Sequence, residues 1–193
     1  REVDCARRTR EGSATRSLMA TTTRLVLMRH AKSDWFAGAG DDFTRPLSER
    51  GLRDARHMGR WLKDSGYLPA VILCSPARRT RQTLERMGED LELDLAARAT
   101  YAEELYHAGL PTLKAVLKRQ GEQREVMLVG HNPGLEELVA WLLDARRPLP
   151  QHAKSFPTAA VYVLDLPDGW ADPRAGSARL VAHQRPKSLS REA

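Results

Sequence analysis

The stretch TRLVLMRHAKSDW, residues 23–35, combines an apolar strand with two basic side chains at its end. Leu25–Met28 supply the aliphatic side chains that strand interiors favour. Arg29 and His30 must then face solvent, a partner or a ligand, because burying an unpaired charge is costly. We interpret Arg29 as a phosphate-binding residue and His30 as a nucleophile. For this pair alone, the alternative is the start of a solvated loop.

Two further apolar runs end in polar residues in the same way. Val71–Cys74 leads into SPARR at residues 75–79, and Val126–Val129 leads into GHNPG at residues 130–134. Taken singly, an arginine run is typical of a solvated helix face, and His131 before Asn-Pro-Gly is typical of a turn. Three such exits in one chain favour a shared site.

The apolar pattern predicts helices between these strands. Residues 52, 55, 58 and 62 form one apolar helix face, with Ser48 as the N-cap and Gly66 as the stop. Further helices are expected at residues 78–91, 110–118 and 135–142, and further strands at 159–166 and 179–183. Alternating strands and helices predict an α/β fold, a three-layer α/β/α sandwich around a mostly parallel open sheet. In such sheets ligands bind beyond the carboxyl ends of the strands.

Length and composition predict one globular domain. The chain has 193 residues, of which 41% are hydrophobic and 29% are charged. We place the domain at residues 23–189, after a disordered leader or added segment at 1–22 and before a tail at 190–193. No apolar run approaches the ~20 residues of a membrane span, and no signal-peptide core is visible, so we expect a cytoplasmic protein without a membrane partner. Cys5 and Cys74 form no disulfide framework.

The net charge of +6 comes mainly from the two ends of the chain. Residues 1–18 hold five arginines against three acidic residues, and residues 171–193 hold five basic residues against two acidic ones. A nucleic-acid-binding face should show a basic stripe on the folded body. We therefore expect no nucleic-acid partner.

Two histidines and several arginines at one sheet edge fit phosphoryl transfer. The transferred group spreads negative charge over three oxygens, which planar guanidiniums bind well. A neutral imidazole attacks to give a phosphohistidine that water later opens, while a second histidine stabilises the same oxygens. With enough arginines neither a metal nor a cofactor is needed. The alternative is a zinc site of His30 and His131 with His107 or His152, but it lacks the close ligand spacing of usual zinc sites.

Five segments carry a family resemblance and occur in the expected order. They are LVLMRHAKSDW (25–35), RPLSERG (45–51), LCSPARRTRQT (73–83), LVGHNPGLEEL (128–138) and KSFPTAAVYVL (154–164). In these the chain resembles the histidine phosphatase superfamily, and more narrowly its SixA-type phosphohistidine phosphatases. The resemblance implies a phosphoglycerate mutase-like sandwich and a metal-independent phosphatase with a phosphohistidine intermediate.

The resemblance also implies a role for each matching residue. His30 corresponds to the nucleophile and Arg29 to its phosphate-binding neighbour. His131 corresponds to the second histidine of the pocket. Arg45 and Arg79 correspond to further phosphate-binding arginines.

The chain departs from the wider superfamily in its general acid. The nearest candidates for that glutamate are Glu103 and Glu104, whereas SixA-type members lack a clear acid. A leaving imidazole needs less proton assistance than a leaving alkoxide, so the resemblance implies phosphohistidine on a protein as substrate. The chain is too short for a large lid, which leaves the pocket open to a protein. Alternatives are a small-molecule phosphomonoesterase, a mutase-like enzyme or a non-catalytic phosphate-binding module.

Overall fold

The structure is a computed structural model that describes residues 22–37, 40–143 and 156–189. Three predictions concern segments outside this range: the leader before Thr22, the tail at 190–193, and His152 as a zinc ligand. The start of the KSFPTAAVYVL segment also lies outside it. These remain predictions.

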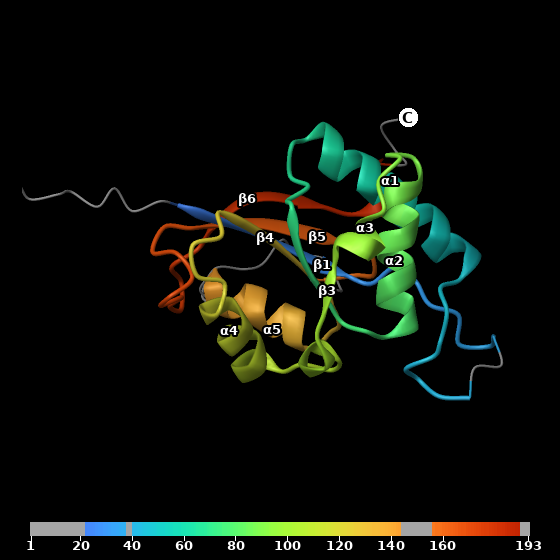
Figure 1. Ribbon diagram of the computed structural model, residues 1–193, viewed down its shortest axis with the longest axis horizontal. Coiled ribbons are helices and arrows are strands. Elements are labelled where there is room, and N and C mark those ends of the chain that lie inside the picture. The colour runs from blue at the N-terminus through green and yellow to red at the C-terminus, as the bar shows by residue number, and fades with distance from the viewer. Residues whose placement is uncertain (1–21, 38–39, 144–155, 190–193) are drawn as a thin grey trace, which may run out of the picture.

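Six strands form a single mixed sheet in the order β3-β2-β4-β1-β5-β6 (Figure 1). β1 pairs in parallel with β4, β4 pairs in parallel with β2, and β2 pairs in parallel with β3. β5 runs antiparallel to both of its neighbours. The strands are β1 (Thr23–Arg29), β2 (Val71–Cys74), β3 (Thr100–Tyr101), β4 (Glu125–Gly130), β5 (Val161–Leu166) and β6 (Arg179–Gln184).

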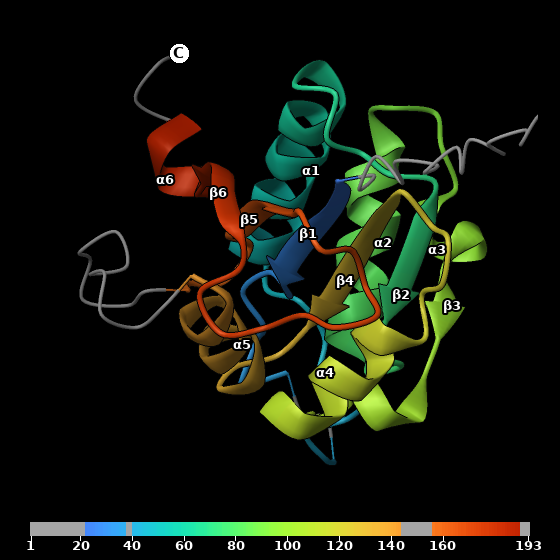
Figure 2. The ribbon, with the colours of Figure 1, turned by 90° about the vertical axis from the view of Figure 1, so that its left-hand side faces the viewer.

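Helices cover both faces of the sheet, which confirms the predicted α/β sandwich (Figure 2). α1 and α2 pack on one face, and α4 and α5 pack on the other. The helices are α1 (Glu49–Asp64), α2 (Arg78–Glu89), α3 (Leu95–Arg98), α4 (Leu110–Lys118), α5 (Gly134–Leu142) and α6 (Pro186–Leu189), with a 3₁₀ turn η1 at Glu103–Leu105. Among the described residues, no helix is both long enough and apolar enough to cross a membrane.

β1 is buried on both sides, which explains its unbroken apolar run. Leu25 and Leu27 belong to the core cluster shared with α4 and α5, whereas Val26 and Met28 belong to the cluster shared with α1 and α2. All four side chains are fully buried. Burying each aliphatic side chain contributes about 1.5–3 kcal/mol, so β1 stabilises the packing of the helices on both faces of the sheet.

The start of α1 is packed directly against the chain that follows β1. Ser48 caps the helix by accepting the N–H of Gly51, as predicted. A Cβ at Gly51 would lie 2.0 Å from the carbonyl oxygen of Lys32, so only glycine permits this close approach. The contact holds the segment after His30 against the first helix.

Three strand exits lie side by side because β4 runs between β1 and β2. The backbone N–H of His30 donates to the carbonyl of Gly130 at 3.1 Å, and that of Ser75 donates to the carbonyl of Val129 at 3.0 Å. These bonds continue the parallel ladder one residue past each strand. The sheet itself therefore places His30, His131 and Ser75 together at its carboxyl edge.

Candidate active site

His30 has a buried imidazole with one nitrogen free to act as a base. The residue is 6% exposed, and its Nδ1 lies 2.7 Å from the carbonyl oxygen of Ala31. A carbonyl only accepts, so Nδ1 carries the hydrogen and the lone pair is on Nε2. Burial lowers the pKa of His30 to about 3, against the opposing hydrogen bond to Ala31 and with help from the positive charge of Arg79. The ring is therefore neutral at physiological pH.

His131 lies beside His30, with 5.2 Å between the two ring centroids. Arg79 Nη2 lies 3.1 Å from Nδ1 of His131, and a guanidinium only donates. Nε2 of His131 therefore carries the hydrogen and donates it to Ser75 Oγ at 2.8 Å. Burial first, and then the neighbouring His30 and Arg79, lower the pKa of His131 to about 2.

These bonds argue against the zinc alternative. Both ring nitrogens of His131 are committed to Arg79 and Ser75, so neither is available as a ligand without breaking a bond in the buried network. Across residues 22–37, 40–143 and 156–189, no group of three or more His, Cys, Asp or Glu side chains is arranged to hold a metal ion.

Three guanidiniums surround the two histidines. Arg29 ends β1, Arg45 lies in the loop before α1, and Arg79 lies in the first turn of α2 with 1% exposure. Four of their buried nitrogens have no hydrogen-bond partner among the described residues: Arg29 Nε, Arg45 Nε and Nη1, and Arg79 Nε. A buried donor without a partner costs about 1–3 kcal/mol, so an anion with several oxygens would stabilise this arrangement.

The structure thus brings together every site residue that the sequence predicted: Arg29, His30, Arg45, Arg79 and His131. Of the two adjacent arginines, Arg79 is buried, whereas Arg78 is exposed. Of the two glutamates considered as acids, Glu104 forms an ion pair with Arg119, just after α4.

Asp42 connects the arginines to each other, and the sequence reasoning missed it. Its Oδ1 accepts from Arg45 Nη2 at 2.7 Å, and its Oδ2 accepts from Arg79 Nη2 at 2.9 Å and from the hydroxyl of Tyr106 at 2.8 Å. Burial alone would raise the pKa of Asp42, but hydrogen bonds from Tyr106 and His107, with the charges of the two arginines, hold that pKa well below its usual range. No local signal in the sequence distinguishes it from the adjacent Asp41.

Tyr106 and His107 follow η1 and bring a third imidazole to the site. The ring of His107 is parallel to that of His131 within 10°, with 5.5 Å between centroids. Gly134 makes this approach possible: a Cβ there would lie 1.8 Å from the carbonyl oxygen of Ala108. The loop after η1 therefore packs directly on the start of α5, next to His131.

An exposed aromatic residue, Trp35, lies beside the arginine cluster, and the adjacent Phe36 is exposed as well. The Arg45 guanidinium carbon lies 3.4 Å from the centroid of the Trp35 ring, a cation–π contact. Trp35 is 69% exposed and Phe36 is 95% exposed. An apolar rim thus borders one side of the site.

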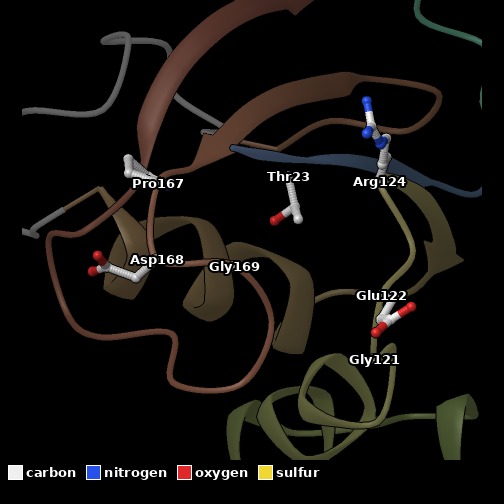
Figure 3. Close-up of a pocket in the computed structure, with 7 residues that line it drawn as sticks. All are labelled: Thr23, Gly121, Glu122, Arg124, Pro167, Asp168 and Gly169. Atoms are coloured by element: carbon white, nitrogen blue, oxygen red, sulfur yellow. The ribbon is translucent and has the colours of Figure 1, made fainter. Parts of the chain in front are cut away.

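A separate hollow of about 500 Å³ lies at the opposite edge of the sheet (Figure 3). It is formed by the start of β1, the segment before β4 and the turn after β5. Its lining carries charges of both signs, from Arg124, Glu122 and Asp168. None of the predicted site residues lines it, so it is distinct from the candidate active site.

Comparison with known proteins agrees with this geometry. A family model described as "Histidine phosphatase superfamily (branch 1)" matches residues 25–106. An uncharacterized protein of Mycobacterium tuberculosis is 38% identical over 167 residues, covering 83% of this chain and all of that relative. Phosphohistidine phosphatase SixA of Escherichia coli is 30% identical over 146 residues, covering 74% of this chain and 85% of SixA.

Solved structures include the protein histidine phosphatase SixA complexed with tungstate. It matches this fold with a TM-score of 0.69 at 26% identity, covering 86% of this chain and 99% of that one. The chain therefore belongs to the histidine phosphatase superfamily, is of the SixA type, and is a phosphatase.

Proposed function

We propose that the chain is a metal-independent phosphatase that forms a phosphohistidine on His30 and acts on phosphohistidine carried by proteins. The observation that supports this most directly is the state of His30. Its ring is neutral, its Nδ1 hydrogen is held by Ala31, and its Nε2 lone pair lies among three guanidiniums.

In the proposed reaction, Nε2 of His30 attacks phosphorus and the bond to the leaving group breaks. Arg29, Arg45 and Arg79 bind the phosphoryl oxygens with their guanidinium groups. His131 accepts a hydrogen bond from Arg79 and so holds this guanidinium in place. Water then attacks phosphorus, the P–N bond breaks, and His30 regains its lone pair.

The proposal of metal independence rests on the number and burial of these arginines. Each preorganised donor at a charge-developing oxygen is worth on the order of a hundredfold in rate. Three guanidiniums supply the charge stabilisation that a divalent cation provides in other phosphoryl-transfer enzymes. Activity should therefore persist after dialysis against a chelator.

A protein substrate is supported by the rim of the site. Trp35 and Phe36 expose aromatic surface next to Arg45, and aromatic side chains are enriched where proteins contact each other. The relatives named phosphohistidine phosphatase support the same class. In addition, Glu104, one of the two glutamates nearest to the acid of the wider superfamily, forms an ion pair with Arg119.

Trapping the phosphoenzyme tests this proposal. After a short incubation with labelled phosphoramidate, the protein should carry an acid-labile, base-stable phosphate, because a P–N bond behaves in this way and a phosphoserine does not. His30→Ala should abolish the label. Label that survives in His30→Ala, or activity that requires added metal, would overturn the mechanism. Comparing a phosphohistidine protein with small phosphate esters then tests the substrate.

A further inference from the structure

We infer that His107, oriented by Asp42, donates the proton to the leaving group and so extends the activity to phosphate esters with strongly basic leaving groups. This inference rests on the proposed function, because it adds a proton donor to the same phosphoenzyme reaction. His107 entered the sequence reasoning only as a possible zinc ligand.

The ring of His131 is in contact with two other imidazoles, one buried and one exposed. The ring centroids of His30 and His131 are 5.2 Å apart, and those of His131 and His107 are 5.5 Å apart. His30 is 6% exposed, whereas the side chain of His107 is 53% exposed. In-line attack by buried His30 sends the leaving group away from His30 toward solvent, and His107 is the exposed imidazole next to the pair.

Asp42 fixes the protonation pattern of His107. Nε2 of His107 lies 3.1 Å from Oδ2 of Asp42. A carboxylate only accepts, so Nε2 carries a hydrogen and Nδ1 is the nitrogen left to exchange a proton with the leaving group. A carboxylate that orients a catalytic imidazole in this way is a recurrent arrangement in hydrolases.

The backbone of His107 has an unfavourable conformation. Its φ is +54°, in the left-handed region that glycine adopts freely and most other residues avoid. Strained residues of this kind persist where the surrounding structure enforces them, often at functional sites. The conformation turns the His107 ring onto His131 and toward Asp42.

The Nε2 lone pair of His30 forms the N–P bond while the bond from phosphorus to the ester oxygen breaks. That oxygen takes the Nδ1 proton of the His107 imidazolium, and the alcohol leaves. In the second step Nδ1 takes a proton from the attacking water, the P–N bond breaks, and inorganic phosphate is released.

The test compares two aryl phosphates in the full chain carrying His107→Asn. Asparagine tolerates the left-handed backbone but cannot act as the acid, so the variant should fold. Phenolate is a poor leaving group that needs the proton, whereas p-nitrophenolate leaves without one. We expect kcat/KM for phenyl phosphate to fall about a hundredfold or more, and that for p-nitrophenyl phosphate to fall less than about tenfold. Equal losses for both substrates would overturn the role of His107.

The pH profile gives a second readout. In the unsubstituted protein, kcat/KM for phenyl phosphate should fall on the alkaline side of its pH profile, and this alkaline limb should be absent in His107→Asn. The charged and titratable groups around His107 are Asp42, Tyr106, His131 and, through Asp42, Arg79. An alkaline limb that persists unchanged in His107→Asn would also contradict the inference.

Two further variants complete the design. His57→Gln, in α1, is the matched control and should leave kcat/KM unchanged for both substrates. Tyr106→Phe removes the hydroxyl that donates to Asp42. A loss selective for phenyl phosphate in Tyr106→Phe, but not in His107→Asn, would transfer the acid role to Tyr106 and overturn the inference. Absence of any His30 phosphoenzyme would instead overturn the proposed function.

Discussion

Replacing Asp42 by asparagine should lower the free energy of unfolding and should increase the rise in Tm that added phosphate produces. Asp42 is the counter-charge of Arg79, which is 1% exposed, and of Arg45, which is 8% exposed. The substitution keeps the shape and one acceptor oxygen but removes the negative charge. Two guanidiniums then remain buried without a neutralising partner.

The size of the effect follows from the bonds that are lost. A hydrogen bond to a charged group contributes about 1.5–3 kcal/mol. The Asp42 side chain is 36% exposed, so solvent screening reduces both ion pairs, and asparagine retains part of one. We expect a net loss of about 2 kcal/mol, which lowers Tm by about 4–8 °C for a chain of this length.

Inorganic phosphate should reverse much of this loss. An anion on the Arg45 and Arg79 guanidiniums supplies the charge that Asp42 provided, so phosphate should bind Asp42→Asn more tightly than the unsubstituted protein. Ligand stabilisation grows as RT ln(1 + [L]/Kd), so the rise in Tm across a phosphate titration should be larger in the variant. Thermal unfolding followed by circular dichroism measures both effects.

Asp41→Asn is the matched control. It removes the same charge from the adjacent residue, whose carboxylate is bonded to the backbone and hydroxyl of Thr44 rather than to an arginine. Its response to phosphate should equal that of the unsubstituted protein. If phosphate raises Tm equally in Asp42→Asn and Asp41→Asn, Asp42 does not neutralise the phosphate-binding arginines and the reasoning is wrong.

Three further predictions concern the histidines and the contacts that position them. His30 and His131 stay neutral in the folded protein but take up protons in the unfolded chain below about pH 6.5. Acidification should therefore lower the free energy of unfolding by up to about 1.4 kcal/mol per pH unit for each ring. Urea titrations should show a shallower pH dependence of this free energy in His30→Gln. Ser75→Ala removes the acceptor of the buried His131 Nε2 hydrogen and should cost about 1–3 kcal/mol, together with lower kcat; unchanged stability would contradict that bond. Gly134→Ala should destabilise the fold although alanine favours helix, because its Cβ would meet the Ala108 carbonyl oxygen, and calorimetry should show a lower Tm.

The strands and the histidines at their ends were predictable because their signals are local. An apolar run that stops at Arg29-His30 is visible in a few residues of sequence. The predicted strand at Val71–Cys74 and helix at Leu110–Lys118 match the structure, and Ser48 caps α1 as expected. In each case the periodicity or the capping residue lies within the element itself.

The shorter elements were not predicted, because they contain too few residues to show periodicity. β3 has two residues, and α3 and α6 have four each. The sequence also left the neighbours of β1 open. β4 pairs with both β1 and β2, so β4 lies between two strands that precede it in the sequence. Such an order depends on packing across the whole domain.

The connections of Asp42 were missed for the same reason. Its bond to Arg79 spans 37 residues and its bond to His107 spans 65 residues. Asp42 lies in a polar loop whose composition predicts no structure, and nothing local distinguishes it from Asp41. Only the fold shows which of the two adjacent carboxylates turns toward the arginines.

Burial explains why this site uses arginines beside its histidines. The same desolvation that lowers the pKa values of His30 and His131 keeps both rings uncharged at neutral pH, which leaves a lone pair on His30 but removes imidazolium as a source of positive charge. Guanidinium is the side-chain cation that keeps its proton under these conditions. For the nucleophile proposed at His30, arginines therefore supply the positive charge, and the Arg29-His30 pair places a guanidinium and an imidazole at the end of one strand.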